Sequence, residues 1–257
     1  MKAHVILAHP ETKSFNGRLA ELSRATLEAA GYKVTLSDLC AMGFDPCEGP
    51  QHYGDRADRE RFHAQTEQRY NAEHHSTPAD VVEEQERLLG CDVLVVHFPL
   101  WWFGPPAILK GWMDRVFVYG AVYRGAMRYD AGICRGKKML ACITTGASAE
   151  SCSYNGREGD TRLMAWPIVF PFRYIGFDVL QPVIFHGVGG VASIEVGDDG
   201  MSETDRYVEQ WGEILRDLEQ RPVVRFNRDE DFGETKQLLE GAPEYSPFVS
   251  HEPHPPW

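Results

Sequence analysis

The sequence predicts an α/β fold in which a parallel β-sheet is covered by helices on both faces. Short apolar runs alternate with helical patterns over the first 220 residues, as they do in sheets built from strand–helix–strand units. Asp92–Phe98 is nearly all apolar and rich in β-branched residues, which is typical of a central parallel strand. The chain has 257 residues, 43% of them hydrophobic, so it is large enough for one sizeable core.

The N-terminal part predicts strand, helix and strand in that order. His4–Ala8 is a short apolar run that opens into a turn, as a buried strand does. Phe15–Ala30 carries apolar residues at helical spacing, and Gly31 provides a natural stop. Lys33–Leu39 is then the second strand. Residues 45–78 are polar and irregular, which predicts either a long surface excursion or short surface helices.

The alternation continues after this polar stretch. In order, the sequence predicts a helix at Asp80–Leu89, the central strand at Asp92–Phe98, a helix at Pro105–Val118, a strand at Lys138–Thr144, a helix within Gly159–Tyr174, a fifth strand at Asp178–Phe185 and an amphipathic helix at Glu203–Gln220. Residues 221–257 are rich in Pro, Glu and His. We therefore expect a core domain of residues 1–220 and a loosely structured C-terminal extension of residues 221–257.

Composition limits the kinds of partner. A formal charge of −12 disfavours nucleic acid and anionic membranes, which need a basic face. No apolar run reaches the roughly 18 residues of a membrane span, and the N-terminal run is too short for a signal peptide. We expect a cytoplasmic protein with no membrane insertion. The six cysteines include no C-x-x-C pair, which predicts reduced thiols and no metal site.

Ligands of an open parallel sheet bind at the carboxyl ends of the strands, and three unusual loops lie there. The glycine pattern of a dinucleotide-binding unit is absent after the first strand. Instead, Thr12, Ser14 and Asn16 offer side-chain hydrogen bonds beside the start of a helix. Free N–H groups at that helix start suit a phosphate. For this loop alone the simpler interpretation, that Ser14 only caps the helix, is favoured.

The second loop is Pro99–Gly104, which follows the central strand. Trp101, Trp102 and Phe103 are consecutive, and such aromatics are costly on a loop unless they pack against something flat. A flavin isoalloxazine ring is flat, and backbone N–H groups could bind its polar edge. A plug of core aromatics is the alternative, but the position at a strand end favours a flavin.

The third loop is Thr144–Ser148. Gly146 allows close approach of backbone to a ligand, and the hydroxyls add donors. Small polar residues occur in many turns, so the loop is significant only as the third of its kind in one sheet. Cys152 follows in a polar segment. We expect a free, partly exposed thiol there, which could be reactive, although most lone cysteines are inert.

These loops carry a family resemblance. The matching stretches are Ala8–Asn16, Phe98–Trp112, Thr144–Gly146, Gly156–Asp160 and Trp166–Ile168, in register from about residue 3 to residue 220. Together they resemble the FAD-dependent NAD(P)H:quinone dehydrogenases of the DT-diaphorase type. The resemblance implies a flavodoxin-like three-layer sandwich whose five-stranded parallel sheet has the order 2-1-3-4-5, with helices on both faces.

The resemblance also implies an activity. Family members are homodimers with one FAD near each interface. NAD(P)H reduces the flavin and leaves, and a quinone then takes the hydride in the same slot. The implied function is therefore two-electron, ping-pong hydride transfer to a quinone or similar conjugated acceptor. The choice of FAD over FMN rests on the resemblance alone.

Site residues carry over by position. Residues implied to hold the FAD diphosphate and ribityl chain are His9, Ser14, Phe15 and Asn16. Residues implied to line the isoalloxazine are Pro99, Leu100, Trp101, Trp102 and Phe103, of which Trp102 and Phe103 also face substrate. Residues implied at its polar edge are Thr144, Thr145 and Gly146, with Ala147 beside them. His63 corresponds to a residue brought to the FAD of the partner subunit, and Tyr123 to a tyrosine of the substrate slot.

Three positions depart from the family. Where its loop carries a tyrosine and a histidine that stabilise the reduced flavin, this chain has Cys152 and Glu158, and Gly125 replaces a second slot tyrosine. A thiol is a weak donor, and an ionised carboxylate only accepts. A protonated Glu158 could act as an acid, and Tyr154 would restore a phenol if the loop shifts. Cys152, Tyr154 and Glu158 are thus the catalytic candidates.

Two other functions compete with this interpretation. The fold also serves as a flavin-containing regulatory subunit of a membrane transporter, which the altered Cys152/Glu158 loop and the long polar segments would suit. A one-electron flavodoxin carrier fits less well, because such carriers are usually shorter, bind FMN and need no aromatic slot.

Overall fold

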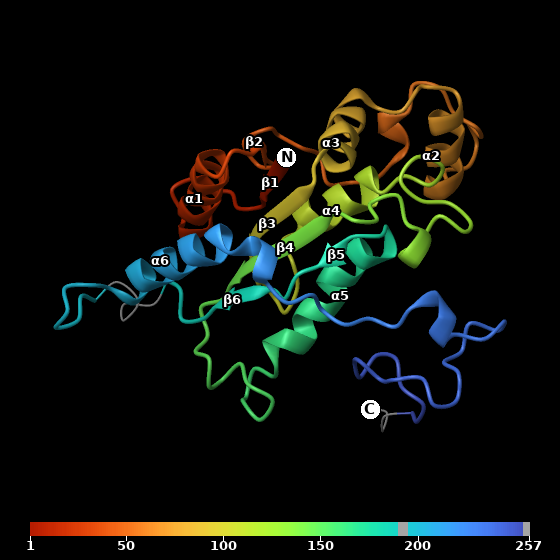
Figure 1. Cartoon of the computed structure of the whole chain (residues 1–257). Helices are drawn as coiled ribbons and strands as arrows, with labels where there is room; N and C mark the ends of the chain where they lie inside the picture. The colour runs from red at the N-terminus through yellow and green to blue at the C-terminus, as the bar shows by residue number, and fades with distance from the viewer. Residues whose placement is uncertain (190–194, 254–257) are drawn as a thin grey trace.

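A parallel sheet with the strand order β2-β1-β3-β4-β5 forms the centre of the molecule (Figure 1). The computed structural model describes residues 1–189 and 195–253. This order is the one that the sequence predicts, and every pairing is parallel. The strands are β1 (Lys2–Leu7), β2 (Lys33–Asp38), β3 (Val93–Pro99), β4 (Lys138–Thr144), β5 (Asp178–Val179) and β6 (Val183–Phe185).

Helices connect the strands and cover both faces of the sheet (Figure 1). Their starts follow local signals: Ser14, Asp160 and Ser202 each accept a backbone N–H as N-cap residues. The polar stretch forms a short helix, as one of the two sequence interpretations predicts. The α-helices are α1 (Phe15–Ala29), α2 (Ala64–Glu73), α3 (Ala79–Gly90), α4 (Ala107–Val116), α5 (Thr161–Tyr174) and α6 (Glu203–Arg216).

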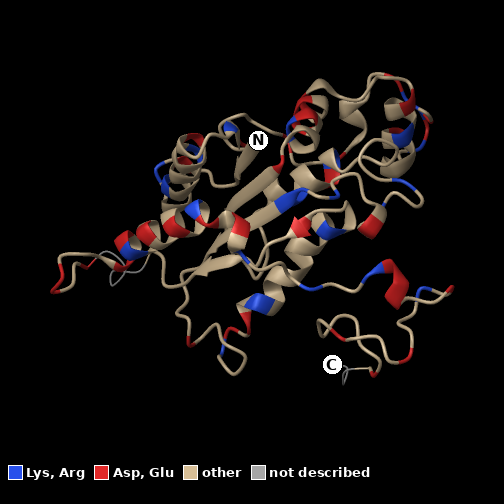
Figure 2. Ribbon diagram, in the orientation of Figure 1, with Lys and Arg blue, Asp and Glu red and all other residues tan. Residues whose placement is uncertain are grey.

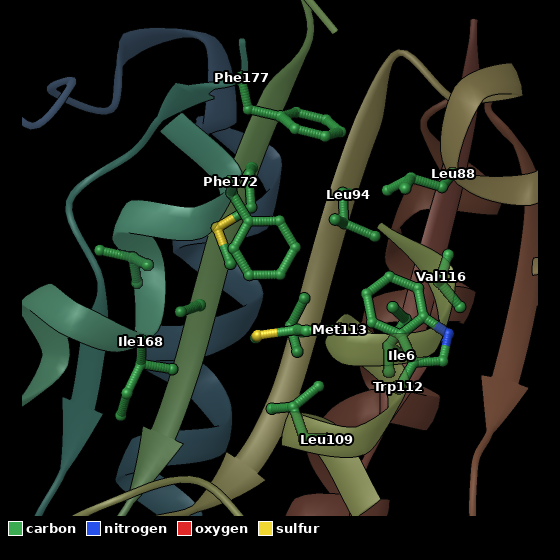
Figure 3. Close-up of a cluster of buried hydrophobic side chains, with 14 of the residues drawn as sticks. Ile6, Leu88, Leu94, Leu109, Trp112, Met113, Val116, Ile168, Phe172 and Phe177 are labelled. Carbon is green, nitrogen blue, oxygen red and sulfur yellow. The ribbon is translucent and has the colours of Figure 1, made fainter. Parts of the chain in front are cut away.

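Successive side chains of the central strand β3 point to opposite faces of the sheet, and the helices they contact show which helix covers which face. Val93 and Val95 point to a cluster built with α1 and α6. Leu94, Val96 and Phe98 point to the opposite cluster, which α3, α4 and α5 complete and which Figure 3 shows. Every residue of β3 is buried. This is why its sequence is a nearly continuous apolar run and not an alternation of apolar and polar residues.

A buried hydrogen-bond network joins α1, β3 and α6. The Ser23 hydroxyl donates to the Leu19 carbonyl at 3.0 Å and accepts the Trp211 indole N–H at 2.8 Å. His97 Nε2 lies 2.9 Å from the same hydroxyl. Since serine has one proton to donate, His97 must donate through Nε2. Its Nδ1 is then the bare nitrogen, which is the atom without a partner.

The predicted fifth strand is divided into β5 and β6. Both pieces pair with β4, but Pro182 has no N–H for the ladder, and the backbone of Leu180 and Gln181 turns to pair with Pro222 and Val223. This is a correction of the sequence prediction.

The C-terminal extension is more structured than its composition indicates. The Val224 N–H donates to the Val179 carbonyl at 2.7 Å, and the Asp229 N–H donates to the Asp130 carboxylate at 2.7 Å. Asp130 also forms an ion pair with Arg173 of α5. Residues 221–253 are thereby tied to the core, while the last four residues of the predicted extension lie outside the described part.

The surface is acidic, and Asp and Glu are spread over the peripheral helices and loops (Figure 2). Among the residues described, no helix is long and apolar enough to cross a membrane.

Two buried histidines make stability depend on pH. Burial lowers the pKa of His97 to about 3 and that of His4 to about 4, so both are neutral in the fold while the unfolded chain takes up protons below about pH 6.5. Stability is therefore full above that value and is lost as the pH falls toward the folded pKa. We expect a loss of about 2 kcal/mol per histidine between pH 7 and pH 5.

The measurement is urea unfolding of wild-type protein, His97→Gln and the control His75→Asn, whose side chain is exposed. His97→Gln should lose about half of the pH-dependent free energy, and His75→Asn should retain it. An unchanged pH dependence in His97→Gln would contradict this account.

Candidate functional site

A cleft of about 450 Å³ lies at the carboxyl ends of β1, β3 and β4. The parallel register Leu7↔His97 and Pro99↔Thr144 brings the three predicted loops to the same edge of the sheet. Predicted site residues that line this cleft are His9, Ser14, Phe15, Asn16, Pro99, Leu100, Trp101, Thr144, Thr145 and Gly146.

The loop after β1 both caps α1 and lines the cleft. The Ser14 hydroxyl accepts the Gly17 N–H at 3.1 Å, so the capping interpretation is correct. Gly17 is required here, because a Cβ would lie 1.9 Å from the Thr12 carbonyl oxygen. The N-terminus of α1 consequently faces the cleft, with the partial positive charge of the helix dipole.

Asn16 carries an unsatisfied buried atom at this edge. Its side-chain amide donates to the Thr144 hydroxyl at 2.8 Å, joining the first loop to the third. Its Oδ1 is buried without a hydrogen-bond partner, and the residue is 3% exposed. A buried acceptor without a donor costs about 1–3 kcal/mol, which indicates that a donor from outside the chain belongs there.

The second loop is a strained aromatic turn. Trp101 and Gly104 exchange backbone hydrogen bonds of 2.9 and 3.1 Å. Between them, Trp102 and Phe103 have φ angles of 51° and 62°, a region that bulky side chains rarely adopt. Trp102 is 96% exposed. The alternative of a core plug is therefore wrong, and such strain with exposed aromatics is typical of a ligand-binding surface.

The third loop is held against the segment after β6. The Thr145 N–H donates to the Phe185 carbonyl at 2.9 Å, and the Val188 N–H donates to the Thr145 carbonyl at 3.0 Å. The Gly146 N–H makes no hydrogen bond within residues 1–189 and 195–253. This backbone donor is therefore open to a ligand in the cleft.

Five lining residues were missed by the sequence reasoning. They are Lys13, Arg18, Val188, Gly189 and Thr204. Lys13 lies inside the first motif, and Arg18 follows Ser14 by four residues on the same helix face, so both had a signal in the spacing. Val188, Gly189 and Thr204 had none, because only the sheet edge brings them there.

Five residues predicted to contact the flavin or substrate lie outside the cleft lining. Phe103, like Trp102, projects from the turn and is 56% exposed. Ala147 donates its N–H back to the Thr145 hydroxyl at 3.4 Å. His63 caps α2 by accepting the Thr66 N–H. Tyr123 packs against Tyr119 and Tyr174, and its hydroxyl accepts from Gln65 at 3.4 Å.

The catalytic candidates are not brought together as a proton-transfer group. Cys152 is buried, at 5% exposure, which corrects the expectation of a partly exposed thiol. Burial raises the pKa of this thiol, and the Glu158 carboxylate adds to the shift. Tyr154 is 80% exposed, and none of the three residues lines the cleft. A buried, protonated thiol is a poor nucleophile.

His186 is an imidazole near this loop that the sequence reasoning missed. Its Nε2 lies 3.1 Å from the Thr161 hydroxyl, and the Thr161 N–H donates to the Cys152 carbonyl at 3.2 Å. Burial lowers the pKa of His186, while the Glu150 carboxylate opposes the shift. The residue follows β6 directly, so its position at a strand end was the available signal.

The cleft offers the groups that a flavin nucleotide needs. A diphosphate needs N–H donors and positive charge, which the start of α1 and Lys13 provide, together with Arg18, whose guanidinium also pairs with Asp205 at 3.1 Å. A ring system needs a flat apolar wall and polar donors at one edge, which Trp101 and the Gly146 N–H provide. The residues present therefore fit a flavin. Among the described residues, no group of His, Cys, Asp or Glu is arranged to hold a metal ion.

This fold and cleft define a class, and comparison with known proteins agrees. Residues 1–212 match the flavodoxin-like fold family, and the chain belongs to that family. A crystal structure of a candidate quinone reductase from Klebsiella pneumoniae superposes with a TM-score of 0.80, at 30% identity and with 93% of each chain covered.

Comparison with curated relatives identifies a group of enzymes within this fold family. The chain is 39% identical over 190 residues to NAD(P)H dehydrogenase (quinone) 1 of Rattus norvegicus, covering 73% of this chain and 69% of the rat protein. It is 37% identical over 185 residues to human ribosyldihydronicotinamide dehydrogenase (quinone), covering 71% and 80% respectively. The chain is thus a homologue of the NAD(P)H:quinone oxidoreductases, and the family predicted from the loops is confirmed.

Replacing Asn16 should change flavin affinity without changing the stability of the flavin-free protein, because its Oδ1 has no partner within the fold. Asn16→Leu removes one hydrogen bond but also removes the buried unpaired acceptor, so the free energy of unfolding without flavin should change by less than about 1 kcal/mol. Flavin affinity should fall roughly tenfold, about 1.4 kcal/mol. Denaturant unfolding and flavin titration test both; unchanged flavin affinity would show that Oδ1 serves no ligand.

The strained aromatic turn should lower the stability of the protein while supporting its activity, so relieving the strain should raise stability and reduce activity. Trp102→Asn places a residue that tolerates positive φ in the turn, so the flavin-free protein should gain about 1 kcal/mol. Loss of the ring should lower kcat/KM for NAD(P)H at least about tenfold. Trp102→Phe retains both strain and ring and is the control, expected to keep wild-type stability and most activity. Greater stability in Trp102→Phe than in Trp102→Asn would contradict the strain argument.

Proposed function

We propose that this protein is a flavin-dependent oxidoreductase that transfers a hydride from NAD(P)H, through FAD, to a quinone or a similar conjugated acceptor. The single observation that carries the proposal is the meeting of three loops at one sheet edge, where a buried unpaired acceptor, a helix N-terminus and an aromatic turn surround one cleft. The quinone dehydrogenase relatives support the same reaction class.

Each part of the cleft has a separate role in this proposal. When bound, FAD would supply the redox chemistry by accepting and passing on two electrons as a hydride. Lys13 and Arg18 would balance the diphosphate charge beside the start of α1. Trp101 would cover the ring, and the Gly146 N–H would donate to its polar edge. These groups hold the ring in place, and positioning supplies much of the rate of hydride transfer.

The aromatic turn would provide the substrate slot. Trp102 and Phe103 are held outward by the turn, so their rings are available to stack on nicotinamide or on a quinone that enters the same space. One slot used in succession gives ping-pong kinetics. We further propose that the active form is a homodimer, in which His63 of one subunit lies near the FAD of the other and Tyr123 lines the slot.

The departures in the loop after Gly146 bear on the acceptor. Cys152 is buried and Glu158 replaces an expected histidine, so the protons that accompany the hydride would come from solvent or from a group such as the exposed Tyr154. We therefore expect reduction of the flavin to proceed as in the family, and the acceptor half-reaction to differ.

Reconstitution followed by stopped-flow absorbance tests the proposal. Protein loaded with FAD should bleach on mixing with NADH or NADPH and recover on mixing with a quinone, with parallel lines in double-reciprocal plots. FMN should support less activity. Protein that stays colourless after incubation with FAD would end the proposal, and fast flavin reduction without transfer to any quinone, nitro or azo compound would favour the regulatory-subunit alternative.

A further inference from the structure

The segment that follows β6 runs beside the third loop of the cleft. Two backbone hydrogen bonds of 2.9 Å join it to this loop, from the Thr145 N–H to the Phe185 carbonyl and from the Gly187 N–H to the Ala147 carbonyl. Between these two bonds, His186 lies on one segment and Gly146 on the other. An imidazole is therefore held on the chain segment next to the backbone donor that is open to a ligand.

The side chain of His186 is half-buried and is fixed on the α5 side of the sheet. The preceding Phe185 packs in the opposite cluster, with α1 and α6, whereas His186 Nε2 lies 3.1 Å from the hydroxyl of Thr161, the first residue of α5. That hydroxyl is also 3.5 Å from the Cys152 carbonyl. The His186 carbonyl accepts the Tyr207 hydroxyl of α6 at 3.1 Å. These contacts tie one imidazole to three elements around the cleft.

The protonation state of His186 decides how the Thr161 hydroxyl is used. An imidazole with a bare Nε2 accepts the hydroxyl proton. A protonated imidazole donates from Nε2 and leaves the hydroxyl proton for the Cys152 carbonyl. Protonation therefore adds a hydrogen bond between the start of α5 and the loop that leads back to Gly146.

The loop side of the imidazole carries one charge that acts on it. Burial lowers the pKa of His186, and the Glu150 carboxylate opposes this shift. Burial raises the pKa of the Cys152 thiol, and the Glu158 carboxylate adds to that shift, so the thiol stays neutral. Glu150 is thus the group of this loop that favours a proton on His186.

The helix side of the imidazole adds no competing acid. Burial and the hydrogen bond to Glu203 raise the pKa of Tyr207 to about 12, so this phenol keeps its proton. Asp160 and Arg162, at the start of α5, form an ion pair with each other. His186 is therefore the group of this cluster that titrates nearest to neutral pH.

We propose that His186 is a positioning residue of the flavin site, which takes up a proton from solvent when the flavin is reduced and releases it when the acceptor is reduced. A hydride carries two electrons and one proton, so its arrival adds one negative charge to the site, which a proton on the imidazole balances. A quinone needs a hydride and a proton to become a hydroquinone, so the release balances the second half-reaction. This inference rests on the proposed function and adds to it a holder for the proton.

Redox potentiometry of the FAD-loaded protein, with dithionite as the reductant, tests the proposal. The imidazolium favours the reduced state, so wild type should have a midpoint potential about 30 mV above that of His186→Gln at about pH 5.5, which is tenfold in a two-electron equilibrium. The two potentials should be equal at about pH 9, where the imidazole is neutral. His75→Asn, at an exposed histidine, is the control and should follow wild type at both pH values. A difference that does not change with pH would show a merely structural role and would overturn the proposal.

An NMR titration of the imidazole follows the same proton without changing His186. The proton affinity of His186 should rise about tenfold when the bound FAD is reduced, with the signal assigned by its loss in His186→Gln. Glu150→Gln, at an exposed side chain, should lower the affinity in both redox states and keep the difference between them. Equal proton affinity in the oxidised and reduced protein would overturn the proposal even if His186→Gln fails to fold.

The proposed function and the role of His186 fail in different ways. Reduction of the flavin by dithionite but not by NADH or NADPH would contradict hydride transfer, while the potentials would still report on His186. Reduction by NADPH without a pH-dependent difference between wild type and His186→Gln would overturn the role of His186 and leave the proposed function in place. Protein that takes up no FAD would overturn both.

Discussion

The parallel pairing of β1, β3 and β4 is the constraint on which the rest of the structure depends. Parallel strands end at the same edge, and the register that pairs Leu7 with His97 and Pro99 with Thr144 brings their loops together. A shift of one residue would turn the buried side chains of β3 to the wrong faces and displace the second loop. The hydrogen bond between Asn16 and Thr144 joins the start of α1 to the end of β4, although β1, which precedes α1, and β4 lie on opposite sides of β3.

The cleft combines backbone strain with an unpaired buried acceptor. Its aromatic turn is strained, and Asn16 Oδ1 has no donor. In the buried network that joins α1, β3 and α6, the hydroxyl of Ser23 is fully used by Leu19, His97 and Trp211. This contrast is physically coherent, because a rigid base is what allows strained and unpaired groups to persist at a surface where a ligand completes them.

The C-terminal extension is held to the core by specific contacts. Asp130 ties it to the core by accepting from Asp229 while pairing with Arg173, and Phe248 stacks on Trp166. These contacts hold the extension against α5 through one hydrogen bond to a paired carboxylate and one aromatic stack.

The sequence by itself determined the first four strands and most of the residues along the cleft, because a buried parallel strand and its following loop are local features: Asp92–Phe98 and Pro99–Gly104 are each continuous in the chain. The strand order followed from the family resemblance of these loops. The tertiary structure decided what depends on distant segments. It broke the fifth strand at Pro182, beside which the Gln181 N–H donates to the Pro222 carbonyl and the Val224 N–H donates to the Val179 carbonyl. It buried Cys152, which the polar composition of its segment did not indicate, and it brought Val188 and Thr204 to the cleft. Burial and long-range contact arise only when the sheet assembles, so no spacing along the chain encodes them.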